Sequence, residues 1–467
     1  KRSRSHRPSL SDNVHVVHFL HVTMTSLVTP SPNITQLLAE CTPPIHLDLN
    51  KHPPVHVAAL WHGAGAASRV FAQANMSYIV KVIKSNAELT PVQIDSYRVE
   101  QAFYNQGFAN TCLEAAQVTV PVCRLCGELQ VESSTSSSHH KSSKSKKKTS
   151  KATNKRKHQK KNTTEQESCP ILGVGPRFYS VLTDLTQTLP VQVEDCNLAQ
   201  ARAALSWMAK VHARFTGKVD SSTNNSDNSD NGARNYNKTL RGLWSSGTYW
   251  TLNRKRDMVT NMDRIYDQEV QRRLKKEHDD STLTPSVLAL GQRLKKAAEA
   301  IHHRLQPSHR LNQSSWFTLV HGDLKGANIA FSGMGDGTGS SGTCTAGVFD
   351  FQWSGGGLGC QDVAYFMIAA VDPAVLELEE ELLRGYYVER KALIRVAKQH
   401  KKHPLMTFEE FKGLYEMALL DFMRWLVSYG LWGGPCEAWS LKKVDEILSK
   451  IDGGSVGQEK VYVDALK

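Results

Sequence analysis

Short apolar runs bounded by turn-forming residues recur along the chain and predict its strands. Runs of this length, next to Gly, Pro, Asn or Ser, are typical of β-strands and too short for ordinary helices. They occupy residues 55–60, 78–84, 178–185, 317–320 and 346–349.

Longer segments have apolar positions three or four residues apart, which predicts helices. In the segment 198–215, Ala201, Leu205 and Met208 follow this spacing, and Asn197 can cap the first turn. We interpret His212 near its end as a packed residue. The other predicted helices are 90–108, 285–305, 363–370, 376–396, 407–429 and 441–451.

The stretch from residue 320 to residue 362 holds the strongest candidate chemistry. It begins with Val-His-Gly-Asp-Leu-Lys-Gly-Ala-Asn, and a Gly-rich gap separates it from the strand that ends at Asp350-Phe351-Gln352. One carboxylate, Asp323, therefore lies in a tight loop, and the amide of Asn328 follows five residues later. A hairpin around the gap would place Asn328 beside the second carboxylate, Asp350.

This arrangement favours phosphoryl transfer. Asp323 can accept the proton of an attacking hydroxyl, while Asn328 and Asp350 offer the oxygen ligands that Mg²⁺ prefers. The alternative is an ordinary turn in which Asp and Asn bond to nearby backbone groups. A lone His-Gly-Asp would favour the turn, whereas the ordered set of three residues favours the catalytic site.

The pattern H-G-D-x-x-x-x-N followed by D-F-Q resembles the phosphotransferase branch of the protein-kinase-like fold. That branch contains aminoglycoside phosphotransferases, choline kinases and the ecdysteroid-kinase-like (CHK kinase-like) group. Asp-Phe-Gln and the later Gln-Asp-Val-Ala-Tyr-Phe at residues 361–366 are most similar to the last group, and the similarity extends from about Trp61 to about Trp432. The resemblance implies ATP and Mg²⁺ as cofactors.

The resemblance also implies an α+β, bilobal protein-kinase-like fold, with a small, mainly antiparallel β N-lobe and a larger helical C-lobe. We expect an N-terminal extension at residues 1–44, either disordered or targeting, the N-lobe at 45–185 and the C-lobe at 186–467. The C-lobe would hold the catalytic loop 320–331 and the metal-binding strand end 346–362.

Phosphate-binding residues are expected in the N-lobe. Gly63 and Gly65, followed by Ser68, predict a Gly-rich turn whose backbone N–H groups could approach phosphates, although Gly-x-Gly alone is more often a plain hairpin turn. The strand at 78–84 resembles the kinase strand that carries the phosphate-binding lysine. Lys81 is the candidate there, and Lys84 is the fallback.

Further roles follow from the resemblance alone. Glu100 would pair with the strand lysine, the alternative being a plain surface Glu. Backbone groups of Leu182, Thr183 and Asp184 would meet adenine. The family has Glu-Asp where this chain has Thr183-Asp184.

Two more residues belong to the predicted catalytic region. Lys325 departs from the family, where an aromatic residue or His is more usual, and resembles the Asp-Leu-Lys of protein kinases, so we expect it to touch the γ-phosphate. Asp362 would support the catalytic loop by hydrogen bonds without touching substrate.

The net charge of +12 resides mostly outside the predicted lobes. Residues 131–168 contain eleven Lys or Arg and three Glu, and residues 1–24 contain four Lys or Arg and one Asp. The remainder is nearly neutral, so no nucleic-acid partner is expected. The low complexity of 131–168 predicts a disordered insertion within the N-lobe.

The sequence contains only weak signals of the cellular compartment in which the protein resides. No apolar run approaches eighteen residues, so no membrane span is expected. Nine scattered cysteines suit reduced thiols and a cytoplasmic protein, and the lone Cys123-x-x-Cys126 is a poor zinc site. Residues 1–24 are basic and poor in acids, so either they target an organelle or translation starts at Met24.

The predicted reaction is transfer of the ATP γ-phosphoryl group to a hydroxyl of a small metabolite. A protein kinase is the first alternative, but about eleven residues, without Ala-Pro-Glu, separate Asp350 from Asp362, too few for a peptide platform. A non-catalytic kinase-like binding protein is the second, and it predicts loss of a metal ligand. The sequence names neither the acceptor nor the oligomeric state.

Overall fold

The computed structural model separates into two compact units. The sheet unit comprises the described residues within Leu27–Leu89 and Arg124–Leu182, and the helical unit those within Thr90–Cys123 and Thr183–Lys467. The structure describes residues 37–41, 44–46, 54–60, 64–72, 76–84, 88–115, 118–128, 176–216, 240–276, 284–306, 316–333, 343–397, 405–431 and 436–466. Residues 1–24, Gly63 and the insertion 131–168 lie outside these ranges.

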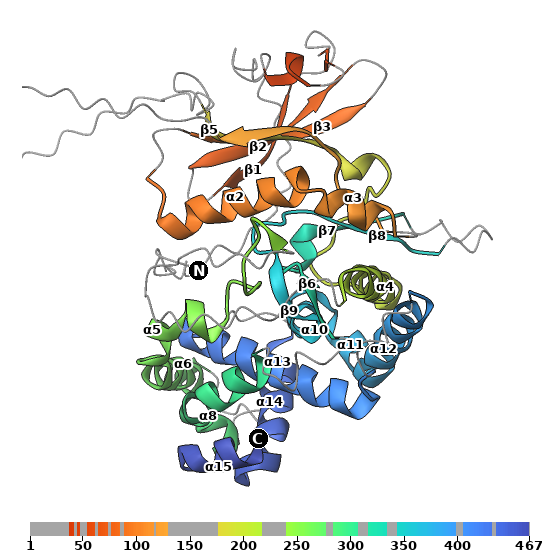
Figure 1. Ribbon diagram of the computed structural model, residues 1–467. Helices are drawn as coiled ribbons and strands as arrows, with labels where there is room; N and C mark the ends of the chain where they lie inside the picture. The colour runs from red at the N-terminus through yellow and green to blue at the C-terminus, as the bar shows by residue number, and fades with distance from the viewer. Residues whose placement is uncertain are drawn as a thin grey trace, which may run out of the picture. The chain divides into compact units, whose positions relative to one another are not determined.

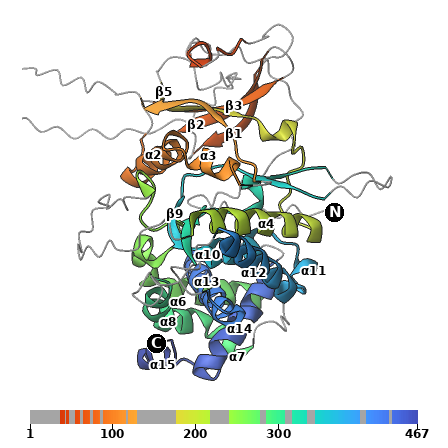
Figure 2. The same cartoon turned by 45° about the vertical axis from the view of Figure 1, so that its right-hand side comes forward.

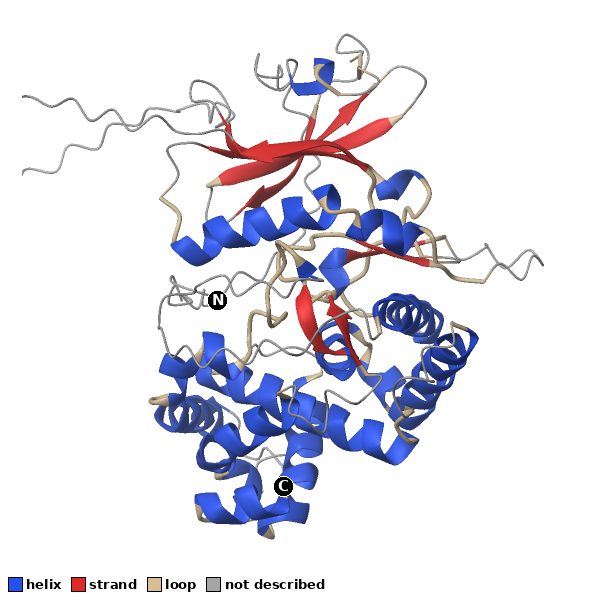
Figure 3. Ribbon diagram, in the orientation of Figure 1, coloured by secondary structure: helices blue, strands red, loops and turns tan. Residues whose placement is uncertain are grey.

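Five strands form the sheet, in the order β1-β2-β3-β5-β4, and Figure 3 shows them in red. The strands are β1 (Val55–Leu60), β2 (Gly65–Phe71), β3 (Ser77–Lys84), β4 (Cys123–Glu128) and β5 (Pro176–Thr183). Both β1–β2 and β2–β3 pair antiparallel. Tyr78, Val80 and Val82 alternate along β3 and pack into a core with Val70 and Val181, because successive strand side chains point to opposite faces.

Short strands and many helices form the helical unit, together with η5 (Gly326–Asn328) (Figure 1). The strands are β6 (Phe317–Val320), β7 (Ile329–Phe331), β8 (Ala346–Val348) and β9 (Gly355–Leu358). The helices are α2 (Pro91–Asn105), α3 (Phe108–Leu113), α4 (Leu198–Phe215), α5 (Arg256–Val259), α6 (Met262–Lys276), α7 (Pro285–Leu288), α8 (Leu290–Leu305), α10 (Gly359–Ala370), α11 (Pro373–Leu376), α12 (Glu379–Val396), α13 (Phe408–Tyr429), α14 (Glu437–Asp452) and α15 (Glu459–Ala465).

Helix α13 is the centre of the helical unit. It begins with a capping box between Thr407 and Glu410 and ends at Gly430, whose φ of 91° is the left-handed cap conformation. Its side chains pack against α6, α8, α10 and α14, and Figures 1 and 2 show it running among them. Each fully buried Leu or Phe stabilises such a core by about 1.5–3 kcal/mol.

The α+β class and the division into a small antiparallel sheet and a larger helical part are confirmed. Helix α4 has the predicted bounds, with Asn197 in a capping box with Gln200. No helix within the described ranges is long and apolar enough to cross a membrane. The eight cysteines in those ranges are all free thiols.

The predicted position of Gly65 and Ser68 in a turn is wrong. Both lie within β2, where Gly65 pairs with Leu60 on one side and Ile83 on the other, and Ser68 pairs with His56 and Val80. A Cβ on Gly65 would lie 2.2 Å from the carbonyl oxygen of Val82. Glycine is therefore required here by the close approach of β2 and β3.

Two predicted helices are each divided. The segment 90–108 ends as α2 at Asn105, and Gly107, with φ 79°, separates it from α3. The segment 285–305 is divided at Ala289 into α7 and α8. In the first case a left-handed glycine ends the helix, as is usual at a C-terminal cap.

Candidate active site

The predicted catalytic loop leaves the end of a fully buried strand. Strand β6 pairs antiparallel with β9, with Val320 opposite Gly355, and both strands lie beside α10 (Figure 1). Gly322 then turns the chain with φ 83°, and a Cβ there would lie 2.3 Å from the carbonyl oxygen of Trp353. The Gly of His-Gly-Asp is thus required both by conformation and by space.

Asp362 holds the backbone of this loop from the first turn of α10. Its Oδ2 accepts from the N–H of His321 at 2.7 Å, and its Oδ1 accepts from the N–H of Gly322 at 2.9 Å. The expected hydrogen bonds between Asp362 and the predicted catalytic loop are confirmed. Burial opposes the charged carboxylate, but the hydrogen bond from His212 and the loop N–H groups outweigh it, so the pKa of Asp362 lies below its usual range.

His212, on α4, extends this buried network. Its Nε2 lies 3.2 Å from Asp362 Oδ2, and its Nδ1 lies 2.8 Å from the hydroxyl of Tyr386 on α12. Burial lowers the pKa of His212 despite the nearby carboxylate. As predicted, His212 is a packed residue, although it contacts the residue that supports the catalytic loop.

His321, the first residue of His-Gly-Asp, connects the loop that carries Asp323 to Phe349, the residue before Asp350. The Nε2–H of His321 donates to the carbonyl oxygen of Phe349 at 3.1 Å, and Nδ1 accepts from the N–H of Asp323 at 3.3 Å. These bonds fit one neutral tautomer. Burial lowers the pKa of His321 and so favours that neutral form.

The carboxylate of Asp323 is buried and accepts three hydrogen bonds from side chains. Oδ1 accepts from the Tyr365 hydroxyl at 2.9 Å. Oδ2 accepts from Lys325 Nζ at 3.1 Å and from Asn328 Nδ2 at 3.2 Å. The three donors hold the carboxylate in one orientation.

Asn328 is fixed by bonds at its amide nitrogen. Nδ2 donates to the carbonyl oxygen of Asp323 at 2.7 Å as well as to its carboxylate. The amide oxygen therefore points away from Asp323. Since the carbonyl oxygen of Asn328 accepts from the N–H of Phe349 at 3.1 Å, the loop lies beside the residue that precedes Asp350.

The hairpin expected around the Gly-rich gap is present as β7 paired antiparallel with β8. Asp350 follows it with φ 70°, a strained conformation for a residue other than glycine, and such strain often occurs at functional sites. Burial opposes the charge of Lys325, but Asp323 and then Asp350 outweigh it and raise the pKa of Lys325. Both carboxylates therefore act on one ammonium group.

These residues fit a magnesium ion in the chemistry of their donors. The orientation of Asn328 frees an amide oxygen, and Asp350 contributes a carboxylate. Among the described residues no group of three or more His, Cys, Asp or Glu could hold a metal. Mg²⁺ does not need such a group, because it keeps several waters and binds substrate phosphates.

The aromatic residue after Asp350 packs on α2. The ring of Phe351 stacks on that of Phe103, with centroids 3.7 Å apart and planes at 7°, and His321 meets Phe351 edge-on at 4.9 Å. Glu100 is buried one turn before Phe103 on the same helix. The surface alternative for Glu100 is therefore wrong, while its pairing with Lys81 stays a prediction because the two residues belong to different units.

Several predicted nucleotide-binding residues have structural contacts of their own. Thr183 pairs with Val122, donating its N–H at 2.9 Å and accepting at Oγ1 at 2.8 Å. Asp184 Oδ1 accepts from the N–H of Thr186 at 3.0 Å and so caps the short helix η2 (Leu185–Gln187). Lys81 and Leu182 lie on β3 and β5 of the sheet unit.

From the sequence, neither Tyr365 nor Tyr249 receives a role. Tyr365 donates to Asp323, and the hydroxyl of Tyr249 lies 3.2 Å from that of Tyr365. Tyr249 also contacts Trp353 and Trp425, at centroid distances of 5.7 and 5.1 Å. The signal available in the sequence was Tyr365 itself, three residues after Asp362 and so on the same helix face.

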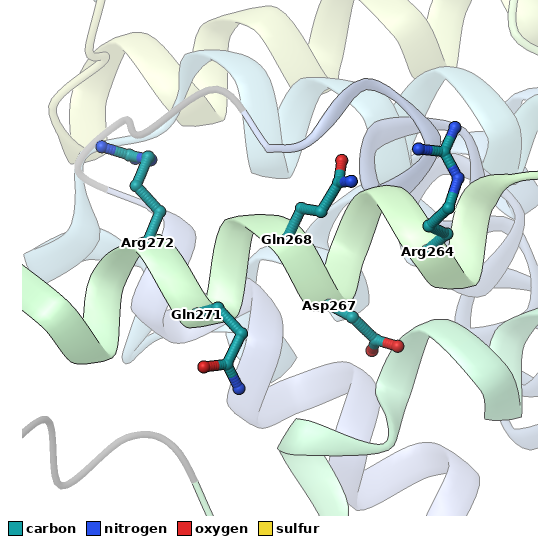
Figure 4. A pocket seen from close by; sticks show the side chains of 5 residues that line it. All are labelled: Arg264, Asp267, Gln268, Gln271 and Arg272. Atoms are coloured by element: carbon teal, nitrogen blue, oxygen red, sulfur yellow. The ribbon is translucent and has the colours of Figure 1, made fainter.

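A shallow depression on α6 is separate from this loop. Its lining residues all come from one helix, as Figure 4 shows, and they are Arg264, Asp267, Gln268, Gln271 and Arg272. Because no second element contributes to it, we assign it no role.

Residues 174–399 match the model of the ecdysteroid kinase-like family. The segment includes the predicted catalytic loop, Asp350 and Asp362, so the resemblance predicted from the sequence is confirmed there. No curated protein sequence matches the chain significantly.

Three of the solved structures that match the chain share little sequence with it. A microcompartment-associated aminopropanol kinase is 13% identical, with 93% of this chain and 97% of that chain covered and a TM-score of 0.40. A macrolide 2'-phosphotransferase from Brachybacterium faecium is 13% identical, with 89% and 96% covered and a TM-score of 0.38. An amicoumacin kinase in complex with AMP-PNP, Ca²⁺ and its ligand is 11% identical, with 87% and 90% covered and a TM-score of 0.37.

Proposed function

Because residues 174–399 match the ecdysteroid kinase-like family, we propose that the protein is an ATP-dependent small-molecule kinase. It would transfer the γ-phosphoryl group of ATP to a hydroxyl of a small metabolite, with sterol-, choline- and aminoglycoside-like acceptors as candidates. The observation that carries this proposal is the cluster formed by Asp323, Lys325 and Asn328 on one loop with Asp350 at the end of β8.

Each residue of the cluster has a distinct part in the proposed reaction. The buried carboxylate of Asp323 orients the acceptor hydroxyl and takes its proton. Lys325, paired with Asp323 and partly exposed, would meet the transferred phosphoryl group. Phosphoryl transfer depends mainly on such positioning and on electrostatic stabilisation.

Asn328 and Asp350 are the proposed ligands of Mg²⁺. When bound, the ion would neutralise charge on the β- and γ-phosphates. The candidates for binding ATP remain Lys81 for the phosphates, and Leu182, Thr183 and Asp184 for adenine.

The structure of the chain after Asp350 favours a small molecule over a peptide as the phosphoryl acceptor. Strand β9 begins at Gly355 and is fully buried against β6, and α10 follows at once. A protein kinase would need an exposed segment here to hold its peptide. The ring of Tyr249 lies beside Tyr365 and contacts Trp353 and the buried Trp425, and we propose that the partly exposed rings of Tyr249 and Trp353 contact the acceptor.

The test is ATP consumption with a panel of hydroxylated small molecules. The wild-type protein should turn over at least one acceptor, and Asp323→Asn should reduce its kcat by about 10²–10⁴-fold, the usual contribution of a positioned base. ATP affinity should change little, because Asp323 is assigned to the acceptor. Asp263→Asn, on α6, is the matched control and should retain full turnover.

Near wild-type turnover by folded Asp323→Asn would remove the proposed role of Asp323. Failure of the wild type to phosphorylate any acceptor, together with no ATP binding, would overturn the kinase proposal as a whole.

A further inference from the structure

Two tyrosines form a hydrogen-bond chain that ends on the candidate base. Tyr365 lies 2.9 Å from Asp323 Oδ1, and Tyr249 lies 3.2 Å from Tyr365, hydroxyl to hydroxyl. A carboxylate can only accept, so the Tyr365 hydroxyl must be the donor to Asp323. The oxygen of Tyr365 then accepts from Tyr249, and the chain runs in one direction.

The ring of Tyr365 is itself held firmly. It meets Phe422 edge-on at 4.8 Å and Tyr249 edge-on at 6.0 Å, and the side chain is fully buried. Burial, followed by the charge of Asp323, raises the pKa of Tyr365 well above its ordinary value. The phenol therefore keeps its proton and remains a donor at any physiological pH.

The position of Tyr365 in the sequence links it to the support of the loop backbone. Asp362 and Tyr365 are one helical turn apart on α10, and residues three apart share a helix face. Asp362 holds the N–H groups of His321 and Gly322, while Tyr365 holds the side chain of the next residue, Asp323. One face of α10 thus fixes both the backbone and the reactive side chain.

The remaining contacts of Asp323 show what the phenol adds. Lys325 and Asn328 both bind Oδ2, so they oppose rotation of the carboxylate about its Cβ–Cγ bond from that oxygen alone. The bond from Tyr365 at Oδ1 restricts this rotation. Charge-assisted bonds of this kind are stronger than bonds between neutral groups.

We propose that Tyr365 is a positioning residue for phosphoryl transfer, which orients the Asp323 carboxylate toward the acceptor hydroxyl while Tyr249 holds the phenol in place. This inference rests on the proposed function. It differs from a purely structural role for a core tyrosine, because it predicts an effect that passes through Asp323.

The first experiment is steady-state kinetics of Tyr365→Phe. The ring and its packing remain, so we expect kcat to fall about tenfold or more while the KM for ATP changes less than twofold. Tyr249→Phe removes only the distal bond and should reduce kcat by a smaller factor. This second variant tests the hydrogen-bond chain from Tyr249 to Asp323 even if Tyr365→Phe folds poorly.

Tyr415→Phe is the matched control. Tyr415 is a buried tyrosine whose hydroxyl donates to a carboxylate, Glu379, at the same distance of 2.9 Å. Removal of the Tyr415 hydroxyl should lower Tm as much as removal of the Tyr365 hydroxyl. It should leave kcat per folded molecule unchanged. Equal effects of Tyr365→Phe and Tyr415→Phe on kcat would overturn the positioning role.

A double-mutant cycle tests whether Tyr365 acts through Asp323. In an Asp323→Asn background, Tyr365→Phe should cause less than a twofold further loss of the residual rate, because the group that it orients is gone. A full tenfold further loss would show that Tyr365 acts elsewhere and would overturn the inference.

The failures of the two proposals are distinguishable. Wild-type protein that phosphorylates no acceptor overturns the proposed function, and with it the reaction assigned to Tyr365. Active wild-type protein whose Tyr365→Phe variant keeps its kcat overturns the role of Tyr365 alone.

Discussion

At the scale of single residues, the predicted catalytic loop owes its geometry to hydrogen bonds that leave its side chains little freedom. His321 bonds to Phe349 and Asp323, Asn328 bonds twice to Asp323, and Asp362 binds two loop N–H groups. Preorganisation of this kind lowers the reorganisation needed when charge develops in a transition state.

The proposed metal ligands should differ in their importance. Asp350→Ala and Asn328→Ala should both weaken Mg²⁺-dependent ATP binding, with Asp350→Ala the worse, because a carboxylate brings a full charge and an amide only a dipole. Water can partly replace the Asn328 oxygen. The measurement is ATP affinity across a Mg²⁺ titration for each folded variant. If the ATP affinity of Asp350→Ala depended on Mg²⁺ as that of the wild type does, Asp350 would be excluded as a ligand.

The grouping of Asp323, Asn328 and Asp350 could be predicted from the sequence because their spacing is local to a loop and a hairpin. Tyr365 could not be found in this way, since its bond to Asp323 spans 42 positions and depends on how α10 packs against the loop. The structural contacts of Thr183 and Asp184 were missed for the same reason. Spacing shows which groups are present, whereas packing decides which of them meet.

At the scale of elements, apolar periodicity predicted most helices and strands correctly, and α4 residue by residue. It failed where one residue interrupts a continuous pattern, as at Gly107 between α2 and α3. It also misplaced Gly65, because a glycine before a strand has the same sequence signal as a glycine within it. The backbone contact that requires glycine there comes from β3.

The attachment of α14 to α8 should depend on one buried arginine. Arg293 binds both oxygens of Asp452, at 2.8 and 2.9 Å, and also contacts Asp445. Arg293→Ala should destabilise the helical unit by about 3–5 kcal/mol, because it leaves a buried carboxylate without its cation. Denaturant unfolding followed by circular dichroism measures the change.

A surface pair provides the control for this prediction. Arg202 pairs with Glu381 between α4 and α12, and both side chains are more than half exposed. Arg202→Ala should therefore cost no more than about 1 kcal/mol. Equal losses for Arg202→Ala and Arg293→Ala would contradict the assigned importance of burial.

At the scale of the whole molecule, three buried histidines should make the helical unit sensitive to acid. Burial lowers the pKa of His212, His302 and His321, so each stays neutral in the folded state where the unfolded chain would protonate it. Protonation therefore favours the unfolded chain as the pH falls below about 6.5, the ordinary pKa of histidine.

The free energy of unfolding should accordingly be level above about pH 7 and fall between about pH 6.5 and 5, by up to about 1.4 kcal/mol per pH unit for each histidine. Urea unfolding at a series of pH values measures this slope. His302→Asn should make the slope shallower, whereas substitution of the exposed His303 should leave it unchanged. A stability independent of pH over this range would contradict the assigned neutral forms.

The stack of Phe351 on Phe103 has a consequence for dynamics. Because Phe351 follows Asp350 directly and Phe103 lies one turn after Glu100, neither the strand end nor α2 can shift without breaking the ring contact or carrying its partner along. Ligand binding at Asp350 should thus slow amide hydrogen exchange both around Asp350 and along α2. The two segments would then open and close as a single cooperative unit.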